Sequence, residues 1–376
     1  MASQTGSRPD HRGRPARRRW RATALVAVVV LAAATGYVLW PQGGKPSSHP
    51  SPAAQGARVR PDARSARLHP AAQPCTVSPA LVPSCGAWWG MYVPQPPTGS
   101  LFRAVTAQES YLGRPLDIVE LYHDMSDTAN GIFPNHAEVR LARTHHLLLY
   151  SWAPANWDRN TVFKWQEIAD GAIDQSVIVP EAERLKALGH PVFLSFSPEA
   201  DSAAASRLGT PAGFVAAWRH IHDVFAQVGA SNVIWVWTTE GYLKHASTIA
   251  ALYPGSSYVD WIGYDPYNFY TCHGAHWETF AQTVEPFYRW LTAHHLGGKP
   301  EMLAEFGSSP DPQQPGRETA WYQGIGPVVR ALPQIKALVQ WNSTVPGCSL
   351  QLADGSAAMA AYRQVGLSPF FRQKLP

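Results

Sequence analysis

Charged side chains are scarce in this sequence of 376 residues, of which Asp, Glu, Lys and Arg make up only 15%. Disordered chains are usually highly charged and poor in aromatic residues, so this composition argues against intrinsic disorder. Aromatic residues reach 11%, and 15 of them are tryptophans. The composition is typical of a folded body with an aromatic-lined surface.

Positive charge is also scarce outside the N-terminal part. Residues 1–74 contain 12 Lys and Arg and only two acids, Asp10 and Asp62. Residues 75–376 therefore hold the other 19 basic and 25 acidic residues, a net charge of −6. Because nucleic-acid binding needs a basic surface, we expect no nucleic-acid partner.

Several enzyme motifs are missing. No GxGxxG follows the first predicted strand, and no P-loop, HExxH or GxSxG occurs. No Cys/His cluster has zinc spacing, and neighbouring histidines such as His145 and His146 point to different sides of an element. We expect no cofactor and no metal.

The N-terminal part reads as an export signal. Residues 1–21 contain seven arginines and precede an apolar run at residues 22–40, which is about long enough to cross a bilayer. The basic flank should stay in the cytoplasm, so the remainder would lie outside, either at the cell surface or free. We favour an uncleaved signal anchor over a cleaved signal peptide. Residues 41–74, rich in Pro, Ala and Ser, read as a linker to a domain at residues 75–376.

Four cysteines in an exported chain make disulfides possible. Of the three possible pairings we favour Cys75–Cys85 with Cys272–Cys348. The first would staple the segment that enters the domain, and the second would tie the loops that follow the sixth and eighth predicted strands. Four free thiols are the alternative.

From Cys85 onward, apolar runs of strand length alternate with helix-period segments. The predicted strands are Ala87–Val93, Leu116–Leu121, His146–Trp152, Pro191–Phe196, Asn232–Trp237, Tyr258–Tyr264, Glu301–Phe306 and Ile335–Trp341. The predicted helices are Leu101–Leu112, His136–Arg143, Pro180–Leu188, Pro211–Val228, Lys244–Leu252, His276–His294, Arg317–Leu332 and Asp354–Val365. Eight of each in strict alternation predict an α/β fold, the (β/α)₈ TIM barrel, with a doubly wound open sheet as the rival.

Two of these strands deliver a glutamate at their C-terminal end. Glu199 follows the fourth strand, and Glu305 ends the apolar part of the seventh. A carboxylate there is costly to desolvate unless it is used or paired, and two carboxyls facing one sugar are what glycosidic bond cleavage requires. The alternatives are a solvated Glu199 and a barrel-mouth salt bridge at Glu305.

Aromatic side chains near the predicted strand ends suit a polysaccharide cleft, because sugar rings present apolar faces. We predict that Trp235 and Trp261, inside strands, belong to the core. Asp265 is expected to bind substrate or form structural hydrogen bonds. The candidate cleft tryptophans are Trp152, Trp157, Trp237 and Trp341.

An ordered series of motifs resembles glycoside hydrolase family 26, and in particular its secreted actinobacterial branch. The motifs are WAPANW (Trp152–Trp157), ADGAID (Ala169–Asp174), GHPVFLSFSPE (Gly189–Glu199), SNVIWVWT (Ser231–Thr238), YPGSSYVDWIGYDPYN (Tyr253–Asn268) and KPEMLAEFG (Lys299–Gly307). The resemblance spans about residues 86–366. It implies a retaining (β/α)₈ enzyme of the β-mannanase type, and that branch also has cysteines after strands six and eight.

The resemblance assigns roles to four residues. It implies that Glu199 is the general acid/base and Glu305 the nucleophile, with Tyr267 orienting Glu305 and Trp341 forming a platform under the sugar. One departure stands out: Pro198 occupies the place of the histidine that usually precedes the acid/base. Proline has neither a polar side chain nor an N–H group, so this change puts rate and substrate in doubt.

The leading hypothesis is therefore an exported, monomeric endo-β-glycosidase that cleaves an extracellular β-linked polysaccharide, mannan-like or β-glucan, with retention of configuration. The main alternative is a catalytically weakened glycan-binding protein of the cell surface, possible because of Pro198. A weaker alternative is a barrel that synthesises or transfers glycans. Substrate specificity depends on loops that the sequence alone does not explain.

Overall fold

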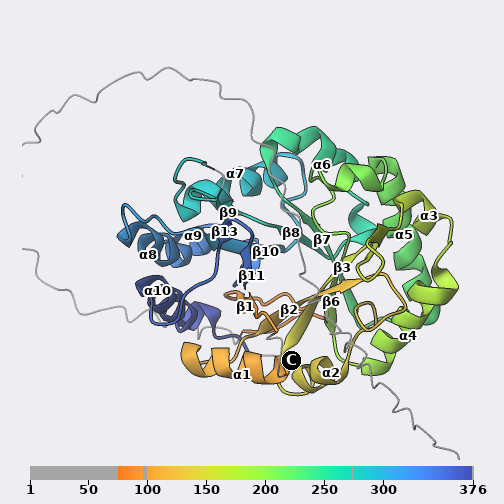
Figure 1. Cartoon of the computed structure of the whole chain (residues 1–376), viewed down its shortest axis with the longest axis horizontal. Helices are drawn as coiled ribbons and strands as arrows, with labels where there is room; N and C mark the ends of the chain where they lie inside the picture. The colour runs from red at the N-terminus through yellow and green to blue at the C-terminus, as the bar shows by residue number, and fades with distance from the viewer. Residues whose placement is uncertain (1–74, 96–99, 273, 375–376) are drawn as a thin grey trace, which may run out of the picture.

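The computed structural model describes residues 75–95, 100–272 and 274–374, which form a ring of helices around a closed barrel of parallel strands (Figure 1). Each barrel strand pairs with the next, and β11 closes the ring by pairing with both β10 and β1. The (β/α)₈ prediction is confirmed. The barrel strands are β1 (Trp88–Tyr92), β2 (Ile118–Asp124), β3 (Leu147–Ala153), β6 (Val192–Phe196), β7 (Val233–Thr239), β8 (Trp261–Tyr264), β10 (Glu301–Ser308) and β11 (Ile335–Trp341).

The predicted leader, apolar run and linker at residues 1–74 lie outside the described residues. Within the part that the structure describes, no helix combines the length and apolar character that a membrane crossing requires.

The helices between the strands largely follow the predicted segments. Those before α8 are α1 (Leu101–Leu112), α2 (His136–Ala142), α3 (Trp165–Ala169), α4 (Val179–Leu188), α5 (Pro211–Val228), α6 (Ala246–Leu252) and α7 (Phe280–Ala293). Local signals fix their ends: Thr210 caps α5 by accepting a hydrogen bond from the Gly213 N–H group, and Gly229, with φ 85°, ends it.

One predicted helix is in fact two. Residues 317–332 form α8 (Gly316–Gln323) and α9 (Ile325–Ala331), which meet at Gly324, and α10 (Ala357–Gly366) completes the ring. Pro327 has no N–H group to donate to the Gln323 carbonyl, so a continuous helix would lack a hydrogen bond there.

Strand alternation divides the core into two layers. One layer fills the barrel and includes Trp88, Phe193 and Trp261, and the other lies between the strands and the helices and includes Trp235. Both Trp235 and Trp261 are buried core residues, as predicted.

The segment that enters the domain closes the N-terminal end of the barrel. Leu81 belongs to the inner layer, and the indole N–H of Trp88 donates to its carbonyl at 2.7 Å. The indole N–H of Trp261 donates to the Ala80 carbonyl, also at 2.7 Å. The Cys75–Cys85 disulfide ties this segment into a loop, so the predicted staple is confirmed.

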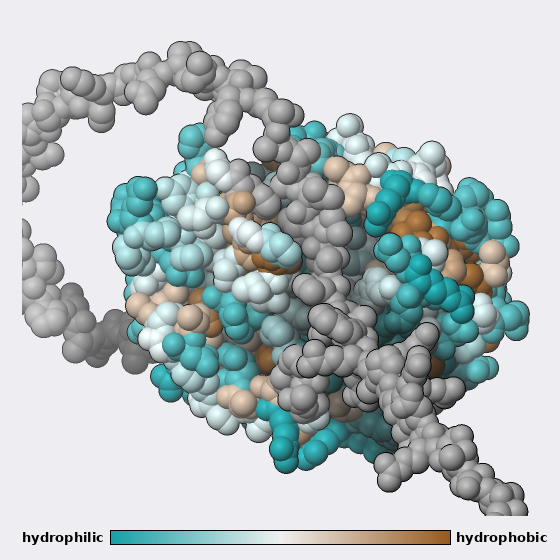
Figure 2. Space-filling model, viewed as in Figure 1, coloured by the Kyte–Doolittle hydropathy of each residue, from teal (hydrophilic) through white to brown (hydrophobic). Residues whose placement is uncertain are grey.

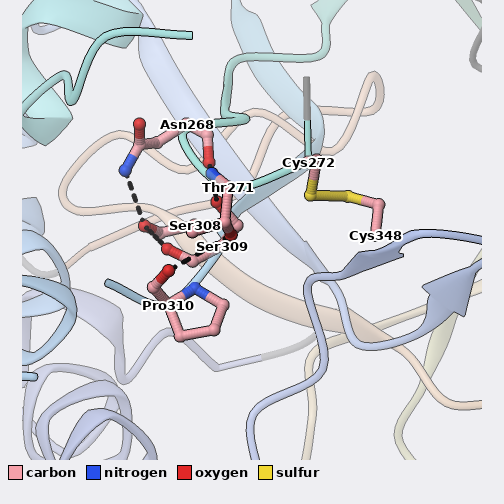
Figure 3. Close-up of a disulfide and its surroundings, with 7 residues drawn as sticks. All are labelled: Asn268, Thr271, Cys272, Ser308, Ser309, Pro310 and Cys348. Atoms are coloured by element: carbon pink, nitrogen blue, oxygen red, sulfur yellow. Dashed lines mark hydrogen bonds between the residues drawn. A yellow bond between two sulfur atoms is a disulfide. The ribbon is translucent and has the colours of Figure 1, made fainter. Parts of the chain in front are cut away.

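Short strand pairs lie beyond the C-terminal ends of the barrel strands. They are β4 (Ala155–Asn156) with β5 (Thr161–Val162), β9 (Tyr267–Asn268) with the end of β10, and β12 (Thr344–Val345) with β13 (Cys348–Ser349). The Cys272–Cys348 disulfide joins the loop after β9 to β13 (Figure 3). The second predicted disulfide is therefore also confirmed.

The described residues present a mainly hydrophilic surface on the face shown in Figure 2, where apolar residues gather in smaller, separate areas.

Candidate active site

A sharp turn after β6 presents Glu199. Ser197 and Glu199 both have left-handed backbones, with φ of 47° and 54°. The Ser197 N–H donates to the Trp152 carbonyl of β3 at 2.8 Å, and the Glu199 N–H donates to the Thr238 carbonyl of β7 at 3.2 Å. Such conformations cost a side-chain-bearing residue about 1 kcal/mol or more each. The neighbouring strands therefore hold Glu199 in a position that its local sequence disfavours.

A β-bulge aims Glu305 into the barrel. Leu303 pairs with Leu338, but Phe306 pairs with Gln340, so β10 uses three steps where β11 uses two. The extra residue of the bulge therefore lies between Leu303 and Phe306, where Ala304 and Glu305 stand. Ala304 faces the barrel interior, and Phe306 packs on the helix side. Bulges are often found where a strand must redirect a functional side chain.

Glu199 and Glu305 line the same cavity at the C-terminal end of the barrel, with a volume of about 180 Å³. Tyr122 also lines this cavity, and so do five residues of the segment that follows Glu199: Ser202, Ala204, Ala205, Arg207 and Leu208. The sequence prediction that the two carboxyls meet at one site agrees with this placement. Their catalytic roles remain predictions.

Two tyrosine hydroxyls donate hydrogen bonds to the Glu305 carboxylate: Tyr122 to Oε1 at 2.6 Å and Tyr267 to Oε2 at 2.5 Å. Tyr267 is held in place because β9 pairs with β10, with Tyr267 opposite Gly307. The Glu305 N–H donates to Asp265 Oδ1 at 2.8 Å. Burial raises the pKa of Glu305, and the two tyrosine hydrogen bonds oppose this rise by favouring the ionised form.

Glu199 has a different environment. No described residue donates a hydrogen bond to its carboxyl group. Burial raises its pKa well above the usual range, and the negative charge of Glu305 raises it further, followed by those of Glu240 and Asp201. A proton shared between the two catalytic candidates is therefore held better by Glu199, while Glu305 is better suited to remain an anion.

Two buried residues of this site were missed by the sequence prediction. They are Tyr122 and Glu120. Glu120 accepts a hydrogen bond from Ser151 Oγ at 3.1 Å, and its pKa is raised by burial and by the charge of Glu305. The predicted strand ended at Leu121, whereas β2 continues to Asp124. The alternation of Ile118, Glu120 and Tyr122 toward the interior was the available signal.

Trp157 lies at the cleft, as predicted. Its side chain is half-buried and lines the cavity. The backbone N–H of Trp157 donates a hydrogen bond to Asp124 Oδ2 at 2.7 Å, and Asp124 Oδ1 accepts one from Ser126 Oγ at 2.6 Å. Asp124 thus forms structural hydrogen bonds, and substrate binding by Trp157 remains a prediction.

The predicted substrate contacts of Trp152 and Trp237 are wrong. Both side chains are fully buried in the layer between strands and helices, where Trp152 packs against Phe225 and Trp237 against Tyr253. In a strand successive side chains alternate between the faces. Ser151 faces the barrel interior instead of Trp152, so the tryptophan one position further along faces the helices.

Asp265 and Trp341 lie close to the candidate catalytic pair but are almost completely buried. Asp265 holds the backbone of Glu305, and its second oxygen, Oδ2, has no hydrogen-bond partner among the described residues. Trp341 stacks on Tyr92 with ring centroids 6.1 Å apart and packs edge-on against Tyr267 at 6.4 Å. Their predicted contacts with substrate remain predictions.

Comparison with known proteins relates this geometry to a family. The sequence model of glycosyl hydrolase family 26 matches residues 204–290. Endoglucanase H of Acetivibrio thermocellus is 28% identical over 285 residues, which are 73% of this chain but only 30% of that protein. Over residues 204–290 this chain is similar to glycosyl hydrolase family 26. It spans less than a third of the length of this curated relative.

Solved structures of family 26 proteins share the barrel fold of this chain. A β-mannanase from Bacteroides ovatus aligns with a TM-score of 0.56 at 16% identity, covering 76% of this chain and 90% of its own. A modular endo-β-1,4-mannanase from Cellulomonas fimi aligns with a TM-score of 0.55 at 15% identity, covering 76% of this chain and 71% of its own. At such low identity the likeness concerns the barrel alone.

Proposed function

We propose that this chain is an endo-β-glycosidase that cleaves an extracellular β-linked polysaccharide, mannan-like or β-glucan, with retention of configuration. The observation that carries the proposal is that two carboxyls in one cavity differ in hydrogen bonding and in pKa. Glu305 accepts two tyrosine hydrogen bonds, whereas Glu199 has a strongly raised pKa. The names of the relatives, an endoglucanase and β-mannanases, support this choice of substrate class.

In the first step, the Glu305 carboxylate attacks the anomeric carbon while Glu199 gives its proton to the departing glycosidic oxygen. The C–O bond of the polysaccharide breaks, and an ester bond forms between the sugar and Glu305. Tyr122 and Tyr267 keep Glu305 oriented for this attack. Glu199 is left as a carboxylate.

In the second step, Glu199 acts as a base. Esterification removes the negative charge of Glu305, so the pKa of Glu199 is no longer raised by that neighbour. Glu199 takes a proton from water, the oxygen of which attacks the anomeric carbon, and the ester bond breaks. Both carboxyls return to their starting states.

We propose that Trp157, which lines the cavity, and Trp341, at the end of β11, supply aromatic surface for sugar rings, while Asp265 holds the backbone of Glu305. The proposal needs no cofactor. We further propose that the chain acts as a monomer outside the cell or tethered at its surface through residues 22–40, in the manner of the secreted actinobacterial branch. The two disulfides suit that location.

Product stereochemistry on β-mannan, mixed-linkage glucan and xylan tests the mechanism, and NMR of the first products should show the β-anomer. A pair of variants separates the two roles. Glu199→Ala should retain activity on aryl glycosides with good leaving groups, because no proton is needed there, and added azide should yield a β-glycosyl azide. Glu305→Ala with azide should yield the α-glycosyl azide instead.

Initial formation of the α-anomer by the wild-type protein would exclude retention. Near wild-type activity of Glu305→Gln on the polysaccharide would exclude Glu305 as the nucleophile. Tight glycan binding without cleavage, and without labelling of Glu305 by a mechanism-based inhibitor, would instead identify a glycan-binding protein.

A further inference from the structure

Three side chains of metal-ligating type gather beside the cleft, and the proposed mechanism does not use them. Asp201 lies two residues after Glu199, Glu240 directly follows β7, and His245 ends the short 3₁₀ turn Leu243–His245. One ligand atom from each lies within 4.8 Å of the others. Asp201 and Glu240 are 4% and 6% exposed.

Asp201 has one oxygen that the protein leaves without a partner. Its Oδ1 accepts the Glu240 N–H at 2.8 Å, which joins the two loops. Its Oδ2 is buried and has no hydrogen-bond partner among the described residues. A buried carboxylate oxygen without a partner is unfavourable, so this atom points to a ligand that the protein chain itself does not provide.

Glu240 and His245 also have polar side-chain atoms without a hydrogen-bond partner among the described residues. No described residue donates a hydrogen bond to the Glu240 carboxylate, and its Oε2 lies 3.4 Å from His245 Nδ1. That Nδ1 atom is buried and also has no hydrogen-bond partner in the described part of the chain. Burial and the nearby Lys244 lower the pKa of His245, which favours the neutral imidazole that a metal requires.

A proton shared between Asp201 and Glu240 would satisfy the two carboxyls but not His245. Burial and the charge of Asp201 raise the pKa of Glu240 to about 7, so a proton can neutralise the carboxyl pair. It would leave Nδ1 of a neutral histidine without a partner. A cation would satisfy Oδ2 of Asp201, the Glu240 carboxylate and Nδ1 together.

We propose that Asp201, Glu240 and His245 bind one divalent transition-metal cation, for which Zn²⁺ is the best match. Two carboxylates and one imidazole suit Zn²⁺ or Mn²⁺, whereas Ca²⁺ and Mg²⁺ prefer oxygen ligands throughout. His245 is partly exposed, so water can complete the coordination. The role is structural: the cation joins the loop that carries Glu199 to the loop after β7.

The full chain, stripped with EDTA and dialysed, should be titrated with ZnCl₂ by calorimetry, and Co²⁺ substitution should be followed by its visible absorption. We expect one site of micromolar affinity or tighter and a rise of several degrees in the unfolding temperature. Asp201→Asn and His245→Ala should each weaken that site at least about tenfold and reduce the Co²⁺ bands.

His222→Ala is the matched control. His222 also lies next to a carboxylate, at 3.3 Å from Asp223, and its side chain is 24% exposed against 29% for His245. This variant should bind zinc as the wild type does. Equal zinc affinity in wild type and His245→Ala, no site even at millimolar zinc, or displacement of Zn²⁺ by equimolar Ca²⁺ would each overturn the proposal.

Discussion

At the scale of single residues, hydrogen bonding separates the two glutamates of the site. Both are carboxyls in the same cavity, and burial raises the pKa of each. Only Glu305 has donors on both oxygens, from Tyr122 and Tyr267. The proposed division of roles between anion and acid therefore depends on two phenol groups that belong to different strands.

Replacing either tyrosine should move the acidic limb of the pH profile. A hydrogen bond to a charged group is worth about 1.5–3 kcal/mol, which corresponds to about one to two pKa units. Without that donor the pKa of Glu305 rises, so Tyr122→Phe and Tyr267→Phe should each shift the acidic limb of kcat/KM to higher pH by about one unit. Tyr288→Phe on α7, outside the set of residues that line the cavity with Glu305, is the control. An unshifted limb in both variants would contradict this account.

A second residue-scale prediction concerns Glu301, the first residue of β10. Its side chain is fully buried and neither carboxylate oxygen has a hydrogen-bond partner among the described residues. Burial raises its pKa to about 8. Since the folded state holds this proton more tightly than the unfolded state, Glu301 costs stability increasingly as the pH rises from about 4.5 to 8.

Glu301→Gln should therefore be more stable than the wild type at pH 8, by several kcal/mol at most, and the difference should disappear near pH 4.5. Urea unfolding at both pH values measures it. Glu285→Gln, a partly exposed residue of α7, should show no such difference. A variant that is destabilised equally at both pH values would show that the carboxyl charge is not the cause.

The sequence predicted which residues lie near the end of a strand, but it did not predict to which face of the sheet each side chain points. Glu199 and Glu305 follow apolar runs, so their meeting could be predicted. Trp152 and Trp237 also lie near strand ends, but a shift of one position turns a side chain from the barrel interior to the helices. The predicted strand boundaries were not accurate enough to decide this.

At the scale of elements, irregular segments place the functional side chains. The bulge in β10 and the left-handed turn after β6 depend on hydrogen bonds from neighbouring strands, which are distant in sequence. Hydrophobic alternation predicted each strand but contains no signal for these irregularities. The two-residue strand β9, which holds Tyr267 beside Glu305, is likewise too short to show a pattern.

The Cys272–Cys348 disulfide joins two such elements above the site. Around it, Asn268 Nδ2 donates to Ser308 Oγ at 2.9 Å and the Thr271 N–H donates to Ser309 Oγ at 3.1 Å (Figure 3). These bonds link the loop after β9 to the end of β10, just beyond Glu305. The disulfide adds a covalent link to the hairpin of β12 and β13, which follows Trp341 at the end of β11.

Removing this disulfide should lower both stability and activity. Its cysteines are 76 positions apart, which corresponds to about 4 kcal/mol of loop-closure entropy. The double variant Cys272→Ser with Cys348→Ser should unfold at lower temperature and have a lower kcat/KM. The matched control, Cys75→Ser with Cys85→Ser, removes a disulfide at the opposite end of the barrel, so it should lose stability but retain activity at moderate temperature. Equal loss of activity in both variants would contradict a local effect on the site.

At the scale of the whole molecule, strands that are apolar on both faces and alternate with helices predicted a covered parallel sheet, and the absence of a glycine-rich first turn favoured the barrel over a doubly wound sheet. The buried acids could not be predicted in the same way. Glu120, Glu240 and Asp201 are brought close to Glu199 and Glu305 by tertiary folding, and no spacing in the sequence marks them as neighbours.

The number of buried acids gives the domain an unusual dependence on pH. Burial raises the pKa of several carboxyls outside the candidate catalytic pair and the proposed metal site, among them Asp117 to about 6, Glu181 and Glu318 to about 7, and Glu301 to about 8. A carboxyl with a raised pKa in the folded state contributes stability below its unfolded pKa, near 4, and loses it as the pH rises through its folded pKa. The net charge of −6 on residues 75–376 adds repulsion that also lowers the stability of the folded state as the pH rises.

The unfolding temperature, measured in EDTA by circular dichroism, should therefore fall steadily between pH 5 and about pH 8, with a smaller slope in Glu301→Gln. An unfolding temperature that rises over this interval would show that the buried acids are stabilised as anions.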